Sequence, residues 1–271
     1  LMATVVAGIL IAILLHPLHA VGVAIGFGLT GIALGQCFRR NLSPVHSVLI
    51  GSVASLASKL IVLAISAAVM GINPLADYTG AMSGAVDQAI DFYRSFGMKE
   101  DDLAKVAQNL RGMIDMMKLI LPAGFVMASV VDTYLNFLVA RAVLRKLGHQ
   151  IGAFPAFSAW NFTPKALAAF IISMALIYWG KSQNIELAAN AGLNLQVVSS
   201  LLFVIQGISV ASFFAAKHDV PRFILWIGGI MAITNGFIMQ AFVFVGAFDI
   251  VFDFRKLRQP LSREKSDSGE E

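Results

Sequence analysis

The sequence predicts an all-α protein, a polytopic transmembrane helical bundle with 7–8 membrane segments. Of its 271 residues, 58% are hydrophobic and only 13% are charged, whereas a soluble domain of this size is roughly a quarter charged. Apolar runs of about 17–25 residues, the length at which a helix crosses a bilayer, recur along the chain. Basic residues cluster at the ends of these runs, where they orient membrane spans. The net charge of +4 therefore gives no indication of nucleic-acid binding.

The first two expected spans cover residues 1–15 and 20–38. Because the chain opens at Leu1 inside an apolar run, we expect further sequence before it. The second span carries two pairs of small residues four positions apart, a spacing that lets helix backbones approach closely in lipid. This pattern predicts close packing within the bundle or, alternatively, a dimerisation face, at Gly22, Gly26, Gly31 and Gly35.

The third expected span, residues 46–70, contains a lysine. Gly51, Ser55 and Lys59 follow one another at intervals of four, so they share one face of a helix. An ammonium group near the middle of a membrane costs several kcal/mol unless it is paired or hydrated. We therefore expect Lys59 to face protein or a water-filled cavity.

Residues 71–112 form the longest polar stretch, with six acidic and four basic side chains. Its pattern predicts one or two amphipathic helices outside the cytoplasm. Asp101 is the expected N-cap of the second helix, which is expected to run straight into the next span. The stretch is either a lid over a binding site or a solvated connector.

The fourth expected span, residues 116–148, contains an acid. Ser129, Asp132 and Asn136 follow at i, i+3 and i+7, which gives a second polar stripe. At 1.5 Å per residue, Lys59 lies about 19 Å and Asp132 about 13 Å from the inner ends of their spans, a difference that a lysine side chain covers. We expect an ion pair between them. The alternative is that water or backbone satisfies each one separately.

Residues 148–165 are rich in aromatic side chains and suit the membrane interface. Spans are then expected at 166–179 and 193–216, the second with Gln206 as its strong polar group. The polar residues Asp249, Asp253 and Arg255 are expected to anchor the final helix at the inner boundary.

The last apolar region, residues 223–251, has basic residues on both sides. The positive-inside rule then favours an even number of crossings, and the turn signal at 234–236 favours a shallow hairpin of two tilted helices. One long tilted span with an external C-terminus is the alternative. The polar end, residues 255–271, is predicted to be disordered.

Motifs for catalysis are absent from the sequence. It contains no phosphate loop, no nucleophile elbow and no HExxH motif. Its single cysteine, Cys37, excludes a disulfide framework, and Pro17 breaks the helix that would align His16 with His19. We expect no enzyme activity, no cofactor and no metal site.

Five segments spread over nearly the whole chain carry a family resemblance: GLTGIALGQCFRR, MGINP, DFYRSFG, RAVLRKLG and FDIVFDFRKL. They resemble the YybS-like family of predicted bacterial membrane proteins, which has no assigned activity. The N-terminal half of that family in turn resembles the S components of energy-coupling-factor vitamin transporters. Those are six-span bundles that hold a small ligand near the outer side. The resemblance implies an S-component-like module over 1–148 and additional helices over 149–254.

Two functions compete for this sequence. The first is a transport-related subunit of the bacterial inner membrane that binds a small solute under the 71–112 stretch. With no ATP-binding motif in the chain, its energy would come from a membrane or ATPase partner. The second is a non-transporting scaffold or regulator of envelope or signalling proteins. For the first function, the expected ligand-binding residues are Lys59, Asp132, Asn136, Ser55 and Ser129.

Overall fold

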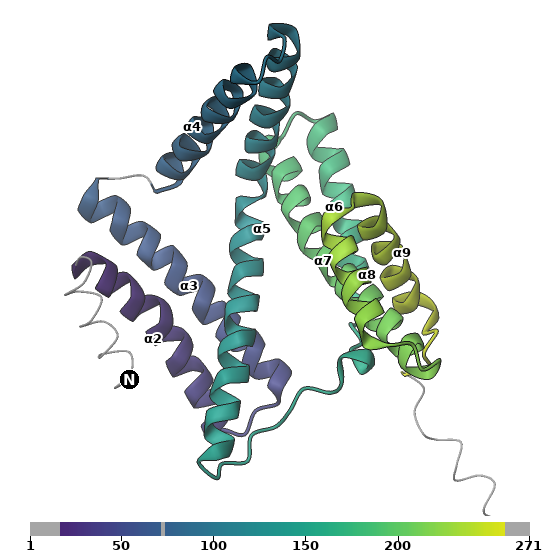
Figure 1. The fold of residues 1–271 in the computed structure, drawn as a ribbon. Helices are drawn as coiled ribbons and strands as arrows, with labels where there is room; N and C mark the ends of the chain where they lie inside the picture. The colour runs from purple at the N-terminus through teal and green to yellow at the C-terminus, as the bar shows by residue number, and fades with distance from the viewer. Residues whose placement is uncertain (1–16, 72–73, 258–271) are drawn as a thin grey trace, which may run out of the picture. The chain divides into compact units, whose positions relative to one another are not determined.

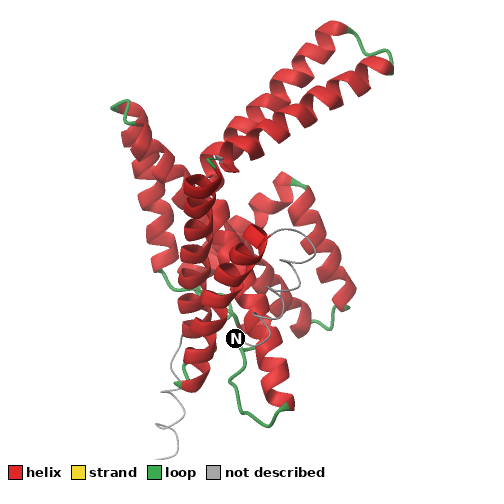
Figure 2. Ribbon diagram, turned by 90° about the vertical axis from the view of Figure 1, so that its left-hand side faces the viewer, coloured by secondary structure: helices red, strands yellow, loops and turns green. Residues whose placement is uncertain are grey.

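The computed structural model describes residues 17–71 and 74–257, and the regular structure in these ranges is entirely helical (Figure 2). The all-α prediction is confirmed, while the expected first span lies outside the described residues. The chain divides into two compact units, Leu1–Ala153 and Phe154–Glu271. The helices are α2 (Pro17–Arg39), α3 (Pro44–Met70), α4 (Pro74–Ser95), α5 (Glu100–Lys146), the 3-10 turn η1 (Phe157–Ala159), α6 (Lys165–Ser182), α7 (Glu186–Lys217), α8 (Arg222–Thr234) and α9 (Gly236–Phe252).

Three of the described helices are long and apolar enough to cross a membrane: α3, α5 and α7. A fourth apolar helix, α9, is shorter. The total of seven or eight membrane segments stays a prediction.

In the first unit, α3 packs against both α2 and α5 (Figure 1). Helix α3 begins where Ser43 accepts a hydrogen bond from the His46 backbone N–H, with Pro44 in the first turn. Both are common signals for a helix start, because the first N–H groups of a helix lack partners within it. The helix ends at Gly71, whose φ of 61° is the left-handed conformation that favours glycine.

Helix α5 has 47 residues, a length of about 70 Å at 1.5 Å per residue. This is more than twice the thickness of a bilayer core, and α4 packs against its first part (Figure 1). The prediction that the polar stretch continues into the fourth span is confirmed. The predicted N-cap at Asp101 is wrong, because the helix begins at Glu100 and is preceded by Lys99, which makes no side-chain capping bond.

Exposed ion pairs tie α4 to the start of α5. Arg111 donates to Asp87 at 3.2 Å, and Arg94 donates to Glu100 at 3.1 Å. The hydrogen bond to Glu100 is the main cause that raises the pKa of Arg94 above its ordinary value. These exposed pairs connect the two helices of the hairpin and contribute little to its stability.

The expected close packing at the glycines of α2 is not found among the described residues. A Cβ added at Gly26, Gly31 or Gly35 would have no described atom within 4 Å, and nothing is described around the side-chain position of Gly22. The tight contact lies instead at Gly51, where a Cβ would stand 2.5 Å from Thr133 of α5 and 3.1 Å from Leu34 of α2. The small residue that lets the three helices meet is therefore on α3.

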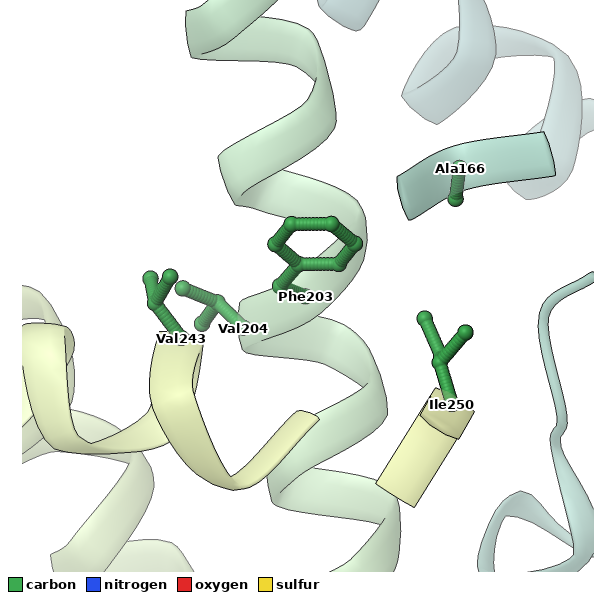
Figure 3. Packing of buried hydrophobic residues seen from close by; sticks show 5 residues of the cluster. All are labelled: Ala166, Phe203, Val204, Val243 and Ile250. Carbon is green, nitrogen blue, oxygen red and sulfur yellow. The ribbon is translucent and has the colours of Figure 1, made fainter. Parts of the chain in front are cut away.

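In the second unit, α7 packs against α6 on one side and α9 on the other. Its buried core joins side chains from all three helices, as Figure 3 shows, and Phe203 is almost completely buried. The five core residues are Ala166, Phe203, Val204, Val243 and Ile250.

Two glycines let α7 and α9 cross in backbone contact. A Cβ on Gly246 of α9 would collide with the Phe203 carbonyl oxygen of α7, and one on Gly207 of α7 would collide with the Phe242 carbonyl of α9. Direct backbone contact of this kind is a feature of helix pairs in membranes.

A buried polar network closes one end of this unit. All five N–H groups of Arg255 find acceptors: Asp249 Oδ2 at 2.9 and 3.2 Å, Ser209 Oγ at 2.9 Å, and the carbonyls of Ser158 and Trp160 at 2.7 and 2.8 Å. Gln206 donates to the same Asp249 oxygen at 2.6 Å. The prediction that residues 255–271 form a disordered tail is therefore wrong at its first residue. Asp249 and Arg255 fix the end of the final helix as expected, while its position at the inner membrane boundary stays a prediction.

The predicted break in the last apolar region is also confirmed. Asn235 has an extended backbone between α8 and α9, and its side chain accepts from the N–H groups of Phe237 and Ile238. The two helices pack against each other. The side of the membrane on which the chain ends stays a prediction.

We predict that Gly246→Ala destabilises the second unit. Overpacking of this kind costs about 1–3 kcal/mol, and a backbone carbonyl has little freedom to move away. Gly228→Ala in α8 is the control, because no described atom lies within 4 Å of its added Cβ. Thermal unfolding of the purified protein should show a lower Tm for Gly246→Ala only. Equal values would contradict the close crossing.

We predict that Arg255→Met destabilises the same unit by about 3–5 kcal/mol, because it leaves the buried Asp249 carboxylate without its cation. The adjacent Lys256 is exposed, so Lys256→Met should change stability by less than about 0.5 kcal/mol. Chemical denaturation of both variants compares them directly. A similar loss in both would show that the network is not the cause.

Candidate functional site

A cavity of about 390 Å³ lies among α2, α3 and α5 in the first unit. Phe27 and Phe125 contribute to its apolar wall. The lining also contains side chains with donors or acceptors: Thr30, Ser55, Ser58, Lys59, Ser66, Asp132 and Asn136.

Lys59 and Asp132 form the expected ion pair, and both residues line this cavity. Lys59 Nζ of α3 donates to Asp132 Oδ2 of α5 at 2.6 Å and to Ser55 Oγ, one turn earlier on its own helix, at 2.8 Å. The pairing hypothesis is confirmed, and the alternative of separate satisfaction is excluded. The pair is not closed off: 25% of the lysine side chain and 48% of the aspartate side chain remain accessible.

Asn136 continues the α5 stripe along the cavity. Its Nδ2 donates to the Asp132 backbone carbonyl at 2.8 Å. Across the cavity, Ser58 donates to the Ser55 carbonyl at 2.7 Å and reaches the Gly26 carbonyl of α2 at 3.3 Å. Hydrogen bonds thus hold the lining of all three helices in place.

One predicted site residue does not reach the cavity. Ser129 is buried, and its hydroxyl donates to the Phe125 carbonyl on the same helix at 2.7 Å. Serines commonly return their hydroxyl to the preceding turn in this way. Ser129 satisfies its polar group within α5, so the polar stripe of the fourth span faces the cavity only from Asp132 onward.

The sequence interpretation missed Thr30, Ser58 and Ser66. Ser66 follows Ser55 and Lys59 on the same helical face, at i+11 and i+7, so extending the stripe would have found it. Thr30 could not be found in this way. Its hydroxyl donates to the Gly26 carbonyl, and the glycines around it dominate the pattern of that segment.

The expected lid is not seen over the cavity. No described residue between 71 and 112 lines it. In the described chain, this stretch instead forms α4 and the start of α5, held together by the ion pairs above. The arrangement favours the connector interpretation.

A larger hollow in the second unit, about 740 Å³, offers a weaker candidate. Asp219 is the charged residue in its lining, where it is accompanied by Ser158 and Ser212. It contains none of the residues that the sequence singled out. The convergence of opposite charges therefore favours the cavity of the first unit.

The helices and the ion pair set among them define an integral membrane protein with a polar cavity between its spans. The chain belongs to the family described as "Predicted membrane protein (DUF2232)", whose profile matches residues 1–250. It is 23% identical over 228 residues to "Uncharacterized protein YybS" of Bacillus subtilis (strain 168), an alignment that covers 83% of this chain and 72% of that protein. The predicted YybS-like membership is confirmed.

No solved structure matches this chain. The resemblance of its N-terminal half to S components therefore stays a prediction. Membrane location follows from the family and from the apolar helices.

We predict that reversing both charges of the pair restores the stability that either single reversal loses. Lys59→Asp or Asp132→Lys alone places like charges together and should cost about 1–3 kcal/mol, less than for a fully buried pair because of the accessible surface. The double variant should recover more than half of the loss in Tm. A double variant no more stable than the single ones would contradict the pairing.

Proposed function

We propose that the first unit binds a small polar solute at the Lys59–Asp132 pair, as a transport-related subunit of the bacterial cytoplasmic membrane. The observation that supports this most directly is an ion pair within apolar helices that remains open to a cavity. Charged groups inside a membrane are costly and commonly mark the path or the site of a solute.

The second unit supplies a comparison within the same chain. There, the side chains of Arg255 and Asp249 are 0% and 1% accessible, and every donor of the guanidinium is used. A pair that is closed in this way has no donor left for a ligand. The partial exposure of Lys59 and Asp132 favours a role in binding.

The size of the cavity is suited to a small molecule, since pockets for such ligands measure about 300–1,000 Å³. Its lining combines apolar walls with a few polar groups, the combination that orients a ligand. The proposed role is binding rather than catalysis, and an energising membrane or ATPase partner would drive transport.

We predict that a small molecule co-purifies with the full chain and depends on the pair. Mass spectrometry should detect it in the wild type and at least tenfold less in Lys59→Met/Asp132→Asn. The matched control is Lys118→Met/Asp115→Asn, which removes an exposed pair on α5 with a 3.0 Å contact outside the cavity. Recovery of membrane-organising proteins with no small molecule would contradict solute binding and favour the scaffold or regulator function.

A further inference from the structure

We infer that the solute is a compact zwitterion, an α-amino acid with an apolar side chain. This inference rests on the proposed function and specifies the chemical class that the same cavity takes. It follows from the unused hydrogen-bonding capacity of the pair, its net charge, the distance between its charges and the surrounding walls.

Both partners of the pair keep hydrogen-bonding capacity for a ligand. A lysine ammonium has three N–H groups, and Lys59 uses two, toward Ser55 and Asp132. Asp132 accepts from Lys59 through Oδ2, and no described residue donates to its Oδ1. The Asn136 side-chain oxygen is likewise without a described partner. The cavity therefore offers one cationic donor beside two acceptors, one of them anionic.

The net charge of the pair selects against singly charged ligands. Lys59 and Asp132 neutralise each other, so a bound anion or cation would add an uncompensated charge between apolar helices. Such a charge is expensive in a low-dielectric region. A zwitterion adds no net charge. Its carboxylate can bind Lys59 and its ammonium can bind Asp132.

The short contact sets the spacing of the charges in the ligand. Nζ and Oδ2 are 2.6 Å apart, so the free N–H and the free Oδ1 lie within about one carboxylate width of each other. A ligand carboxylate that accepts from Lys59 and a ligand ammonium that donates to Asp132 are therefore held close together, as they are when both groups are bonded to one carbon. An α-amino acid has this arrangement, whereas a zwitterion with widely separated charges does not.

The remaining lining is apolar and fits a hydrocarbon side chain. Phe27 of α2, Val62 and Leu63 of α3 and Phe125 of α5 face the same cavity. A buried apolar group is stabilised by roughly 25 cal/mol per Å² removed from water. An apolar side chain would gain this energy while the charged end meets the pair.

The experiment compares three matched sets of probes against the purified full chain. The first set is leucine, isoleucine, valine, methionine and phenylalanine. The second set is the corresponding carboxylic acids without the amino group, and the third is the corresponding amines without the carboxylate. Equilibrium binding measured by calorimetry should show at least one amino acid that binds tenfold or more tighter than its own acid and amine. Binding should disappear in Lys59→Met/Asp132→Asn and persist in Lys118→Met/Asp115→Asn.

Each other outcome overturns the inference. An acid or amine that binds as tightly as its amino acid would exclude the zwitterion and leave solute binding intact. Amino-acid binding that survives in Lys59→Met/Asp132→Asn would place the site elsewhere. If none of the amino acids binds, the proposed ligand class is wrong. The co-purification experiment then decides separately whether the cavity holds another solute.

Discussion

A polar side chain between apolar helices has no bulk water to satisfy it, and this constraint governs both units of the protein. Each charge must find an opposite charge, a hydrogen-bonding partner or a hydrated space. In the second unit the charges are fully enclosed, and Arg255 donates every side-chain N–H to Asp249, Ser209 or one of two backbone carbonyls. The first unit meets it by pairing Lys59 with Asp132 beside a cavity.

The closed network around Arg255 and Asp249 fixes the path of the chain more than it adds to the stability of the fold. Removing two charges from water costs about as much as their attraction returns, so a buried pair is weak evidence for a stabilising role. Asp249 also has a buried oxygen, Oδ1, with no partner in the described chain. What the network does is connect the residue that follows α9 with α7 and with the turn η1. It thereby fixes where the chain goes after its last apolar helix.

Helical periodicity was enough to find most of the candidate site. It put Ser55 with Lys59 on one face and Asp132 with Asn136 on another, and the depth of each charge predicted their pairing. Periodicity failed where a contact depends on which helix lies opposite. The glycines of α2 have the spacing of a packing motif, yet among the described residues an added Cβ would come closest to a backbone atom at Gly246, Gly207 and Gly180, and the tight position of the first unit is Gly51. The carbonyl partners of Arg255 could not be predicted from the pattern around it, because they belong to residues 95 and 97 positions earlier in the chain.

The ion pairs Lys59–Asp132 and Arg255–Asp249 use similar groups and differ in the hydrogen-bonding capacity that they leave free. Arginine suits the closed network because its planar fork of five donors can be satisfied on several sides at once. Lysine carries three donors on a flexible stem, so Lys59 can hold Asp132 and Ser55 and still present an N–H to the cavity. The residues that form the open pair come from α3 and α5, and those two helices, together with α2, also supply the cavity walls. In the first unit, packing of the helices and assembly of the candidate site are therefore one event.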